Sequence, residues 1–413
     1  MCGTVARARV AAMSRKRILY LVHRTPYPPN RGHRIRSFHW LDYLSQRAEV
    51  DLAFLADEPL EEDHLTELRF RCQRVAWVRT SRLGQRMRGI LSLLRGRSAT
   101  EAAFYSPRLE RTVRRWLAET TYDAVIAYCS SMAIYLRRLG LSPNRCIVDL
   151  VDVDSQKWLD YAETVAFPQA FLYRLEGNRL RRFERELDHL AKFLIFVTEQ
   201  ESQIFREFHP TEKIRVVENG VDLAYFDPAH SGEPTPAPQT PVRLVFVGAM
   251  DYYPNVDGVT WFLREIWPRV RNAGDVVFDI VGAGAGKSFW RLVEATPGAR
   301  LVGNVPDVRP YLRGSVSVVP LRIARGLQNK VLEAMAMGCP VVASPAALEG
   351  LDVAVGEDVL SAQDVDNWVE QLTQLIHSPE MRSRLGAAAR AKIEKRYQWP
   401  DRLRVLDDLL GLS

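Results

Sequence analysis

The segment 318–344, VVPLRIARGLQNKVLEAMAMGCPVVAS, contains the residue pattern best suited to chemistry on an anionic ligand. Helix-forming residues run from Lys330 to Met337. Asn329 suits the N-cap, and Gly338 suits the left-handed position after the helix. The first N–H groups of a helix lack partners within it and carry a partial positive charge. This helix start is therefore predicted to favour a phosphate.

Charged side chains surround the same predicted helix start. Arg322, Arg325 and Lys330 add cations, and an arginine can bind two phosphate oxygens at once. Glu333 follows Lys330 by three residues and lies on the neighbouring helix face. Its carboxylate could accept hydrogen bonds from a ribose diol. The alternative is an ordinary capped helix with solvated charges.

A basic turn, PPNRGHRIR, follows the first expected strand. Gly32 permits a ligand to approach the backbone closely. Arg31, His33, Arg34 and Arg36 crowd the same turn, although cations at a helix start oppose its dipole. We expect contact with donor phosphates and with an acceptor. The alternative is a solvated basic helix start, with His33 a surface residue rather than a catalytic base.

Three aspartates end the expected strand CIVDLV: Asp149, Asp152 and Asp154. Carboxylates in this arrangement could bind a metal or acceptor hydroxyls. No partner motif supports a metal, so we expect none. Asp152 and Asp154, with Lys157, are predicted on the acceptor side; the alternative is a set of turn-forming aspartates.

The sequence VGAGAGKS at 281–288 superficially resembles a phosphate-binding loop, but its spacing is wrong. A P-loop needs a glycine where Val281 stands, within the expected strand. The dinucleotide fingerprint also fails. A glycine loop after a strand is the better interpretation, in which Gly282 and Gly284 approach the ligand.

These candidates follow a regular alternation of short β-branched runs and helical patterns. Continuous apolar strands between helices indicate parallel sheets covered on both faces. Residues 227–241 contain five prolines and predict a linker. The chain is therefore expected to form two doubly wound α/β halves facing a central cleft, with ligands at the C-terminal strand ends. Strands are expected to begin near residues 17, 50, 74, 123, 146, 193, 214, 243, 276, 299, 316 and 340.

Composition sets the class of protein. The 413 residues are 47% hydrophobic and 26% charged, which is ordinary for a globular chain of two or three domains. The net charge of +6 favours anionic partners but is too small to indicate nucleic acid. Scattered cysteines suggest a reducing cytosol, and no apolar run could span a membrane. Residues 1–14 are expected to be a disordered extension.

Residues 69–97 hold nine arginines and no acid. Between Arg82 and Arg95, apolar residues recur at helical spacing. This pattern predicts a helix over 82–95 that lies on an anionic membrane surface. The alternative is a core-packed helix with a basic solvent face.

Four segments together resemble family 4 retaining glycosyltransferases: GLQNKVLEAMAMGCPVVAS, VENGVDLAYFDP, RLVFVGAMDYYPNVDG and TPYPPNRGHRIRSFHWL. The segment CIVDLVDVDSQKW further resembles a subgroup associated with PEP-CTERM/exosortase systems. The resemblance implies the GT-B fold, with Rossmann-like domains at 15–226, packed against 398–413, and at 242–397. It also implies a nucleoside diphosphate sugar donor and no other cofactor.

The sequence departs from this family at two places. Glu333 matches the second of two family glutamates, which implies that it holds the ribose. The first would fall on Arg325, so the usual sugar-contacting carboxylate is missing. The loop between Gly248 and Asn255 also lacks the family's cations. Arg322, Arg325 and Lys330 are the nearest replacements for a diphosphate clamp.

These patterns predict a cytoplasmic enzyme on the inner face of the plasma membrane. It would transfer sugar to a glycan or polyprenyl-linked acceptor in exopolysaccharide or cell-surface polysaccharide synthesis. The alternatives are a nucleotide-sugar epimerase or hydrolase of the same fold, or a degenerate binding protein. The expected catalytic residues are Arg325, Lys330 and Glu333; donor-binding residues are Gly32, Gly248, Gly282, Arg322, Gly326 and Asn329; acceptor-side residues are Arg31, Arg36, Asp152, Asp154 and Lys157.

Overall fold

The chain forms two compact units in a computed structural model that describes residues 15–229, apart from Arg31, and 241–412, apart from Arg325. The first unit runs to Ile195 and also contains Thr211–Arg215 and the segment from Val405 onward. The second contains Phe196–Pro210 and Val216–Arg404. The expected extension at 1–14 and most of the expected linker lie outside the described residues.

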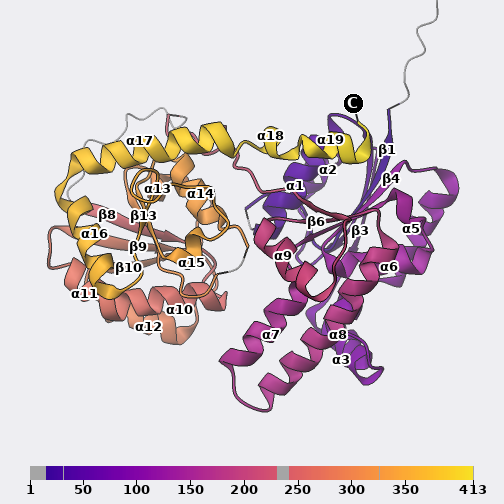
Figure 1. The fold of residues 1–413 in the computed structure, drawn as a ribbon, viewed down its shortest axis with the longest axis horizontal. Coiled ribbons are helices and arrows are strands. Elements are labelled where there is room, and N and C mark those ends of the chain that lie inside the picture. Colours follow the sequence, from indigo (N-terminus) through magenta and orange to yellow (C-terminus); the bar gives the residue numbers. More distant parts are fainter. Residues whose placement is uncertain (1–14, 31, 230–240, 325, 413) are drawn as a thin grey trace, which may run out of the picture. The chain divides into compact units, whose positions relative to one another are not determined.

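The first unit is built on a seven-stranded parallel sheet in the order β3-β2-β1-β4-β5-β6-β7 (Figure 1). The strands β1, β2, β4 and β5 are almost completely buried, as their continuous apolar sequences predict. The strands are β1 (Arg17–Val22), β2 (Glu49–Ala56), β3 (Arg74–Arg79), β4 (Ala124–Tyr128), β5 (Cys146–Val151), β6 (Phe193–Phe196) and β7 (Ile214–Val216).

Helices connect these strands, and serines begin several of them. The hydroxyls of Ser81, Ser98 and Ser106 accept hydrogen bonds from the first turns of α3, α4 and α5. The helices are α1 (Gly32–Ser45), α2 (Glu62–Arg71), α3 (Arg82–Leu94), α4 (Ala99–Ala103), α5 (Pro107–Glu119), α6 (Ala133–Leu139), α7 (Asp154–Thr164), α8 (Gln169–Leu190) and α19 (Val405–Leu410).

The second unit contains a six-stranded parallel sheet in the order β10-β9-β8-β11-β12-β13. Its strands are β8 (Val242–Val247), β9 (Val276–Val281), β10 (Ala299–Gly303), β11 (Val316–Val319), β12 (Val341–Ala343) and β13 (Leu360–Ser361). Its helices are α9 (Glu199–Phe208), α10 (Tyr253–Trp261), α11 (Trp267–Val270), α12 (Lys287–Glu294), α13 (Arg309–Leu312), α14 (Asn329–Ala336), α15 (Pro345–Leu348), α16 (Val365–His377), α17 (Pro379–Arg396) and α18 (Trp399–Leu403).

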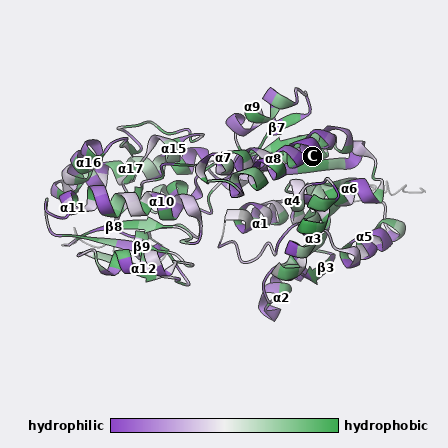
Figure 2. Ribbon diagram, turned by 90° about the horizontal axis from the view of Figure 1, so that it is seen from below, coloured by the Kyte–Doolittle hydropathy of each residue, from purple (hydrophilic) through white to green (hydrophobic). Residues whose placement is uncertain are grey.

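The observed alternation confirms the predicted pair of doubly wound parallel sheets. Hydrophobic residues concentrate in the strands, while the surrounding helices carry the hydrophilic ones (Figure 2). Sequence patterns missed β13, because a strand of two residues has no periodicity to detect. The expected segment 398–413 is divided between the units: α18 groups with the second and α19 with the first.

Candidate functional site

The strand order of the second unit reverses between β8 and β11. In open parallel sheets, ligands bind at such a reversal, beyond the carboxyl ends of the strands. Lys330 in the first turn of α14, which follows β11, reaches the first turn of α10, which follows β8. Its Nζ donates a hydrogen bond to Oδ1 of Asn255, at 2.6 Å. Asn255 in turn donates from Nδ2 to the carbonyl of Ala249, at 2.8 Å. An ammonium group therefore lies beside the start of α10, the helix that follows β8.

Lys330 and Glu333 are both half-buried, and their protonation is shifted toward neutrality. Burial lowers the pKa of Lys330 to about 8, although the charge of Glu333 opposes this shift. Burial raises the pKa of Glu333 to about 7, opposed by the charge of Lys330. Two shifted groups at a sheet's reversal point are typical of a functional site.

The start of α14 differs by one residue from the prediction. The N-cap is Gln328, not Asn329, and its side chain makes no capping hydrogen bond. Asn329 instead begins the helix, and its Oδ1 accepts a hydrogen bond from Nδ2 of Asn219, at 3.1 Å. Asn219 is buried and belongs to the NGVD turn. That turn therefore positions the helix start.

The loop between β11 and α14 contains two arginines, of which the structure describes only Arg322. Arg322 directs its guanidinium at the carboxylate of Asp257 in α10; Nε lies 2.9 Å from Oδ2, and a second bond joins Nη2 to Oδ1. Two guanidinium nitrogens of Arg322 are thus already hydrogen-bonded within the protein. Arg325 lies outside the described residues. Gly326 has φ +62°, a left-handed conformation that favours glycine.

Two of the expected donor-contacting glycines, Gly248 and Gly282, contact each other closely. A Cβ added at Gly282 would lie 1.8 Å from the carbonyl oxygen of Gly248. At Gly284, with φ +89°, an added Cβ would lie 2.7 Å from the Cβ of Asp251. Gly282 and Gly284 of the VGAGAGKS loop are therefore required for packing against the loop after β8.

A further cluster near Glu333 escaped sequence analysis. Tyr225 Oη donates to Oδ1 of Asp307 at 3.3 Å, and Arg309 pairs with both oxygens of that carboxylate. The Arg309 guanidinium lies 4.0 Å from the centroid of the Tyr225 ring. Burial, then the charge of Asp307, and more weakly that of Glu333, raise the pKa of Tyr225. The residues come from two distant segments, so no local motif reveals them.

The sheet of the first unit reverses between β1 and β4. His23 follows β1 and stacks on the ring of Tyr128, with centroids 5.5 Å apart. Cys129 follows β4, and its Sγ lies 4.0 Å from Nε2 of His23. Cys129 and Val151 have φ of +72° and +70°, which side chains rarely adopt. Backbone strain of this kind concentrates at functional sites, so this edge is the second candidate region.

The predicted acceptor-side residues Asp152, Asp154 and Lys157 do come together there. Lys157 Nζ lies 2.7 Å from Asp152 Oδ2 and 3.5 Å from Asp154 Oδ1. Ser130, which follows β4, donates its hydroxyl to Asp154 at 2.8 Å. Burial and the nearby charge of Asp154 raise the pKa of Cys129 well above its ordinary value, so this thiol stays protonated at neutral pH.

The buried position of Arg36 contradicts the prediction that this residue contacts the acceptor. It is 1% exposed and forms two hydrogen bonds with Asp149, of 2.8 and 2.9 Å. The pair fixes α1 to β5 and leaves no exposed guanidinium surface. Gly32 is exposed at the start of α1. Arg31 lies outside the described residues, as does the side chain of His33.

Within the part of the chain that the structure describes, neither a metal-binding cluster nor a membrane-spanning helix occurs. No group of three His, Cys, Asp or Glu side chains there could hold a metal ion. No helix in the described segments is long and apolar enough to cross a bilayer.

The chain is similar to several known proteins. The family model "Glycosyl transferases group 1" matches residues 241–378. A mannosyltransferase of Corynebacterium glutamicum, described as GDP-mannose-dependent and acting on a monoacylated phosphatidylinositol monomannoside, is 26% identical. The similarity covers 54% of this chain and 63% of that protein. The chain thus spans less than two thirds of that relative.

Solved structures match nearly the whole chain. Sucrose-phosphate synthase from Thermosynechococcus elongatus has a TM-score of 0.70 at 17% identity, covering 97% of this chain and 100% of that one. HepE from Anabaena, in complex with UDP and glucose, has a TM-score of 0.66 at 14% identity, covering 96% and 100%. The fold is therefore GT-B, as predicted. The family match and the mannosyltransferase relative support glycosyltransferase activity.

Proposed function

We propose that this chain is a retaining glycosyltransferase that moves a sugar from a nucleoside diphosphate sugar to a glycan or lipid-linked glycan. The observation that carries the proposal is the contact of Lys330 with Asn255 across the reversal point of the second sheet. It places an ammonium group at the start of α14, where helix N–H groups also point. Glu333 lies one turn further along the same helix.

Different residues of the proposed donor site bind different parts of the donor. Lys330 and the N-terminus of α14 bind the diphosphate, and Glu333 accepts hydrogen bonds from the ribose hydroxyls. Arg325 is proposed, from sequence alone, as a further phosphate ligand in place of the family's glutamate. Gly248, Gly282 and Gly326 shape the backbone around the donor. Arg322 stabilises the loop through Asp257.

The chemical task is to stabilise a leaving diphosphate. Negative charge grows on that group as the glycosidic bond breaks. A fixed ammonium and helix dipole stabilise this charge with little reorganisation. The leaving phosphate takes the acceptor proton, so the reaction occurs on one face of the sugar and retains its anomeric configuration. No protein nucleophile enters this scheme.

The acceptor is proposed to bind at the carboxyl edge of the first sheet. Asp152 and Asp154, with Lys157 between them, can hold sugar hydroxyls through charged hydrogen bonds. His23 adds an imidazole at the same edge. The strained backbone at Cys129 and Val151 turns both loops sharply at this position.

The cellular role proposed is exopolysaccharide or cell-surface polysaccharide synthesis, with the protein on the inner face of the membrane through residues 82–95. The sequence segment CIVDLVDVDSQKW supports the PEP-CTERM-associated subgroup. The relatives are described with different donors, GDP-mannose in one and UDP with glucose in another. A screen must therefore include both nucleotides.

A two-step experiment tests the function. Thermal shift with UDP-glucose, GDP-mannose and related donors identifies the nucleotide, because a ligand of the folded state raises its stability with concentration. Product analysis of the best donor, with and without glycan acceptors, then follows. Sugar transfer with retained configuration supports the proposal. Hydrolysis or epimerisation alone would support the alternative enzyme, and stabilisation by no donor would support a degenerate binding protein.

A further inference from the structure

The helix α3 directs its large apolar side chains toward solvent rather than toward the core. The exposed fraction ranges from 47% for Leu91 to 80% for Leu94. Its inner face is made of small residues: Ser92 donates its hydroxyl to the carbonyl of Ser98 at 2.7 Å, and Gly89 packs against Ala99. This reverses the usual amphipathic orientation. The exposed residues are Leu83, Met87, Ile90, Leu91 and Leu94.

The tip of the α7–α8 hairpin shows a second exposed apolar group, which sequence analysis did not find. Phe167 is 82% exposed, Phe171 58% and Leu172 52%. The hairpin beneath them is well packed, with the rings of Trp158 and Tyr173 5.2 Å apart. The apolar residues thus stand on an ordered support.

Hydrogen bonds connect the two apolar groups within the first unit. Glu176 of α8 accepts from the hydroxyl of Ser98 at 2.6 Å and from the N–H of Thr100 at 2.9 Å, at the start of α4. Arg179 donates to the carbonyl of Leu93 at 2.6 Å. Helix α8 begins at Gln169, seven residues before Glu176, which is about 10 Å along the helix axis. In Figure 1 both α3 and the hairpin project on the lower side of this unit.

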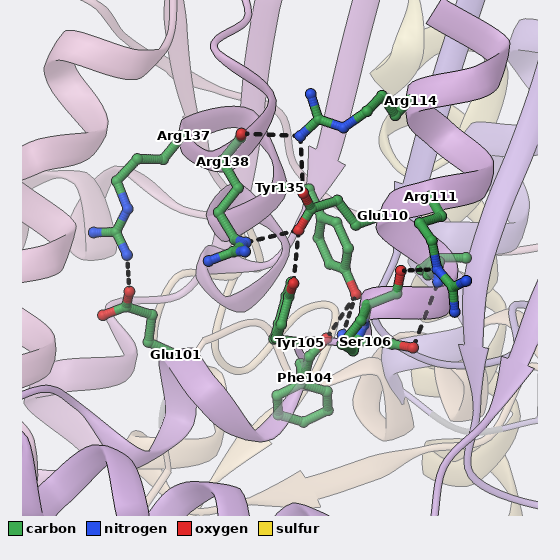
Figure 3. A network of polar contacts seen from close by, with 12 residues as sticks. Glu101, Phe104, Tyr105, Ser106, Glu110, Arg111, Arg114, Tyr135, Arg137 and Arg138 are labelled. Atoms are coloured by element: carbon green, nitrogen blue, oxygen red, sulfur yellow. Dashed lines mark hydrogen bonds and ion pairs between the residues drawn. The ribbon is translucent and has the colours of Figure 1, made fainter.

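A polar network fixes the base on which α3 and α4 rest. Glu101 of α4 pairs with Arg137 of α6, and Glu110 of α5 accepts hydrogen bonds from Arg138 at 2.7 Å and from Tyr105 at 2.7 Å (Figure 3). These contacts join three helices. They hold α4, against which Gly89 of α3 packs, in a fixed position.

Charge identifies the partner that fits this surface. Arg86 within α3, and Arg95 and Arg97 just after its C-terminal end, are exposed, in a region that has no acid from 69 to 97. Arg88 is excluded, because it donates to the carbonyl of Ala103 at 3.1 Å. An apolar stripe flanked by arginines matches acyl chains below anionic headgroups. The hairpin carries exposed Glu163 and exposed Arg174, whose charges are opposite, so its contribution is mainly apolar.

We propose that the α3 stripe and the hairpin tip form one bilayer-binding surface, with arginines on phosphate headgroups and Phe167, Phe171 and Leu172 in the acyl boundary. Two contact points fix the tilt of the first unit on the membrane, whereas α3 alone would not. The inference uses the proposed function only to explain why this orientation is useful: it presents a lipid-linked acceptor to the first unit.

A matched pair of single substitutions tests the hairpin contribution. Phe167→Ser removes a ring that is 82% exposed at the tip, and Phe70→Ser removes one that is 85% exposed on α2, outside the proposed surface. Co-sedimentation is measured with phosphatidylglycerol–phosphatidylcholine vesicles. We expect Phe167→Ser to weaken binding by at least about tenfold and Phe70→Ser to leave it unchanged. Equal binding of wild type and Phe167→Ser would overturn the two-point surface.

Salt separates the two kinds of contact. Arg95→Gln with Arg97→Gln should weaken binding at low salt and have little effect at high salt, because headgroup attraction is screened. The Phe167→Ser defect should persist at high salt. Loss of both defects at high salt would overturn the apolar insertion. A change in oligomeric state without a change in vesicle binding would assign the tip to a second copy of the chain instead.

Donor titration keeps this test independent of the proposed function. Phe167→Ser should bind the donor nucleotide as wild type does, because the hairpin tip is not part of the donor site. Donor binding without any vesicle binding would overturn the membrane surface and leave the function standing. Vesicle binding without donor binding would overturn the proposed function and leave the membrane surface standing.

Discussion

The Nζ atom of Lys330 lies 2.6 Å from Oδ1 of Asn255, and this contact joins the starts of α14 and α10 at the reversal point of the second sheet. Asn255 is 3% exposed and cannot turn away, because its Nδ2 is bound to the carbonyl of Ala249. The ammonium is thus held at the start of α14. A phosphate bound at this position can replace the Asn255 oxygen as the hydrogen-bond acceptor of the Lys330 ammonium.

Donor affinity should depend on pH in two opposite ways. Lys330 loses its proton as the pH rises through about 8, and Glu333 gains one as the pH falls through about 7. Both side chains are charged only between these values, so affinity should be greatest there. Calorimetric titration with an intact nucleotide sugar at several pH values checks this prediction. A free nucleoside diphosphate is unsuitable, because its terminal phosphate would itself titrate at roughly pH 6.

Two variants test which group causes the acid-side decline and which the alkaline-side decline in donor affinity. Glu333→Gln should remove the decline on the acid side, and Lys330→Arg should remove the decline on the alkaline side. A profile that is unchanged by both substitutions would contradict the assignment of these two groups.

Glu333→Ala should weaken binding of a nucleoside diphosphate by about 1.5–3 kcal/mol, because a charged hydrogen bond to the ribose is lost. Inorganic pyrophosphate, which has no ribose, should bind equally to wild type and mutant. Glu294→Ala on exposed α12 is the matched control. An equal loss for both ligands would mean that Glu333 acts on the phosphates and not on the ribose.

Gly282→Ala should destabilise the second unit by more than about 3 kcal/mol, because the new Cβ would lie 1.8 Å from the Gly248 carbonyl oxygen. Gly286→Ala, in the same loop, meets nothing within 4 Å and has φ −73°. It should cost less than about 1 kcal/mol. Denaturation midpoints measure both. Similar midpoints would show that packing does not require Gly282.

Sequence periodicity predicted the sheets well because strands such as β1 and β5 are buried along almost their whole length. It also predicted the helix that carries Lys330 and Glu333, since helix-end signals are local. Side-chain partners were not predictable. Arg36 looked like a ligand-binding residue in a basic turn, yet its partner Asp149 is 113 residues away. The pair of Tyr225 with Asp307 spans 82 residues and has no local signature either.

The Arg36–Asp149 pair yields a stability prediction. Arg36→Met leaves a buried, unpaired carboxylate and should cost about 3–5 kcal/mol. The double variant Arg36→Met/Asp149→Leu removes both charges and should recover most of the loss. Urea denaturation compares the three proteins. If the double variant is as unstable as the single one, unpaired charge is not the cause.

Calorimetric titration of UDP-glucose and GDP-mannose into wild type and Lys330→Met tests the central claim most directly. Lys287→Met is the matched control, because this exposed lysine belongs to the GAGKS sequence of the neighbouring loop. The account predicts a ten- to hundredfold loss of affinity for the preferred donor in Lys330→Met, about the value of one charged hydrogen bond, and none in Lys287→Met. Wild-type affinity in Lys330→Met, or a loss confined to Lys287→Met, would contradict the donor site at the start of α14.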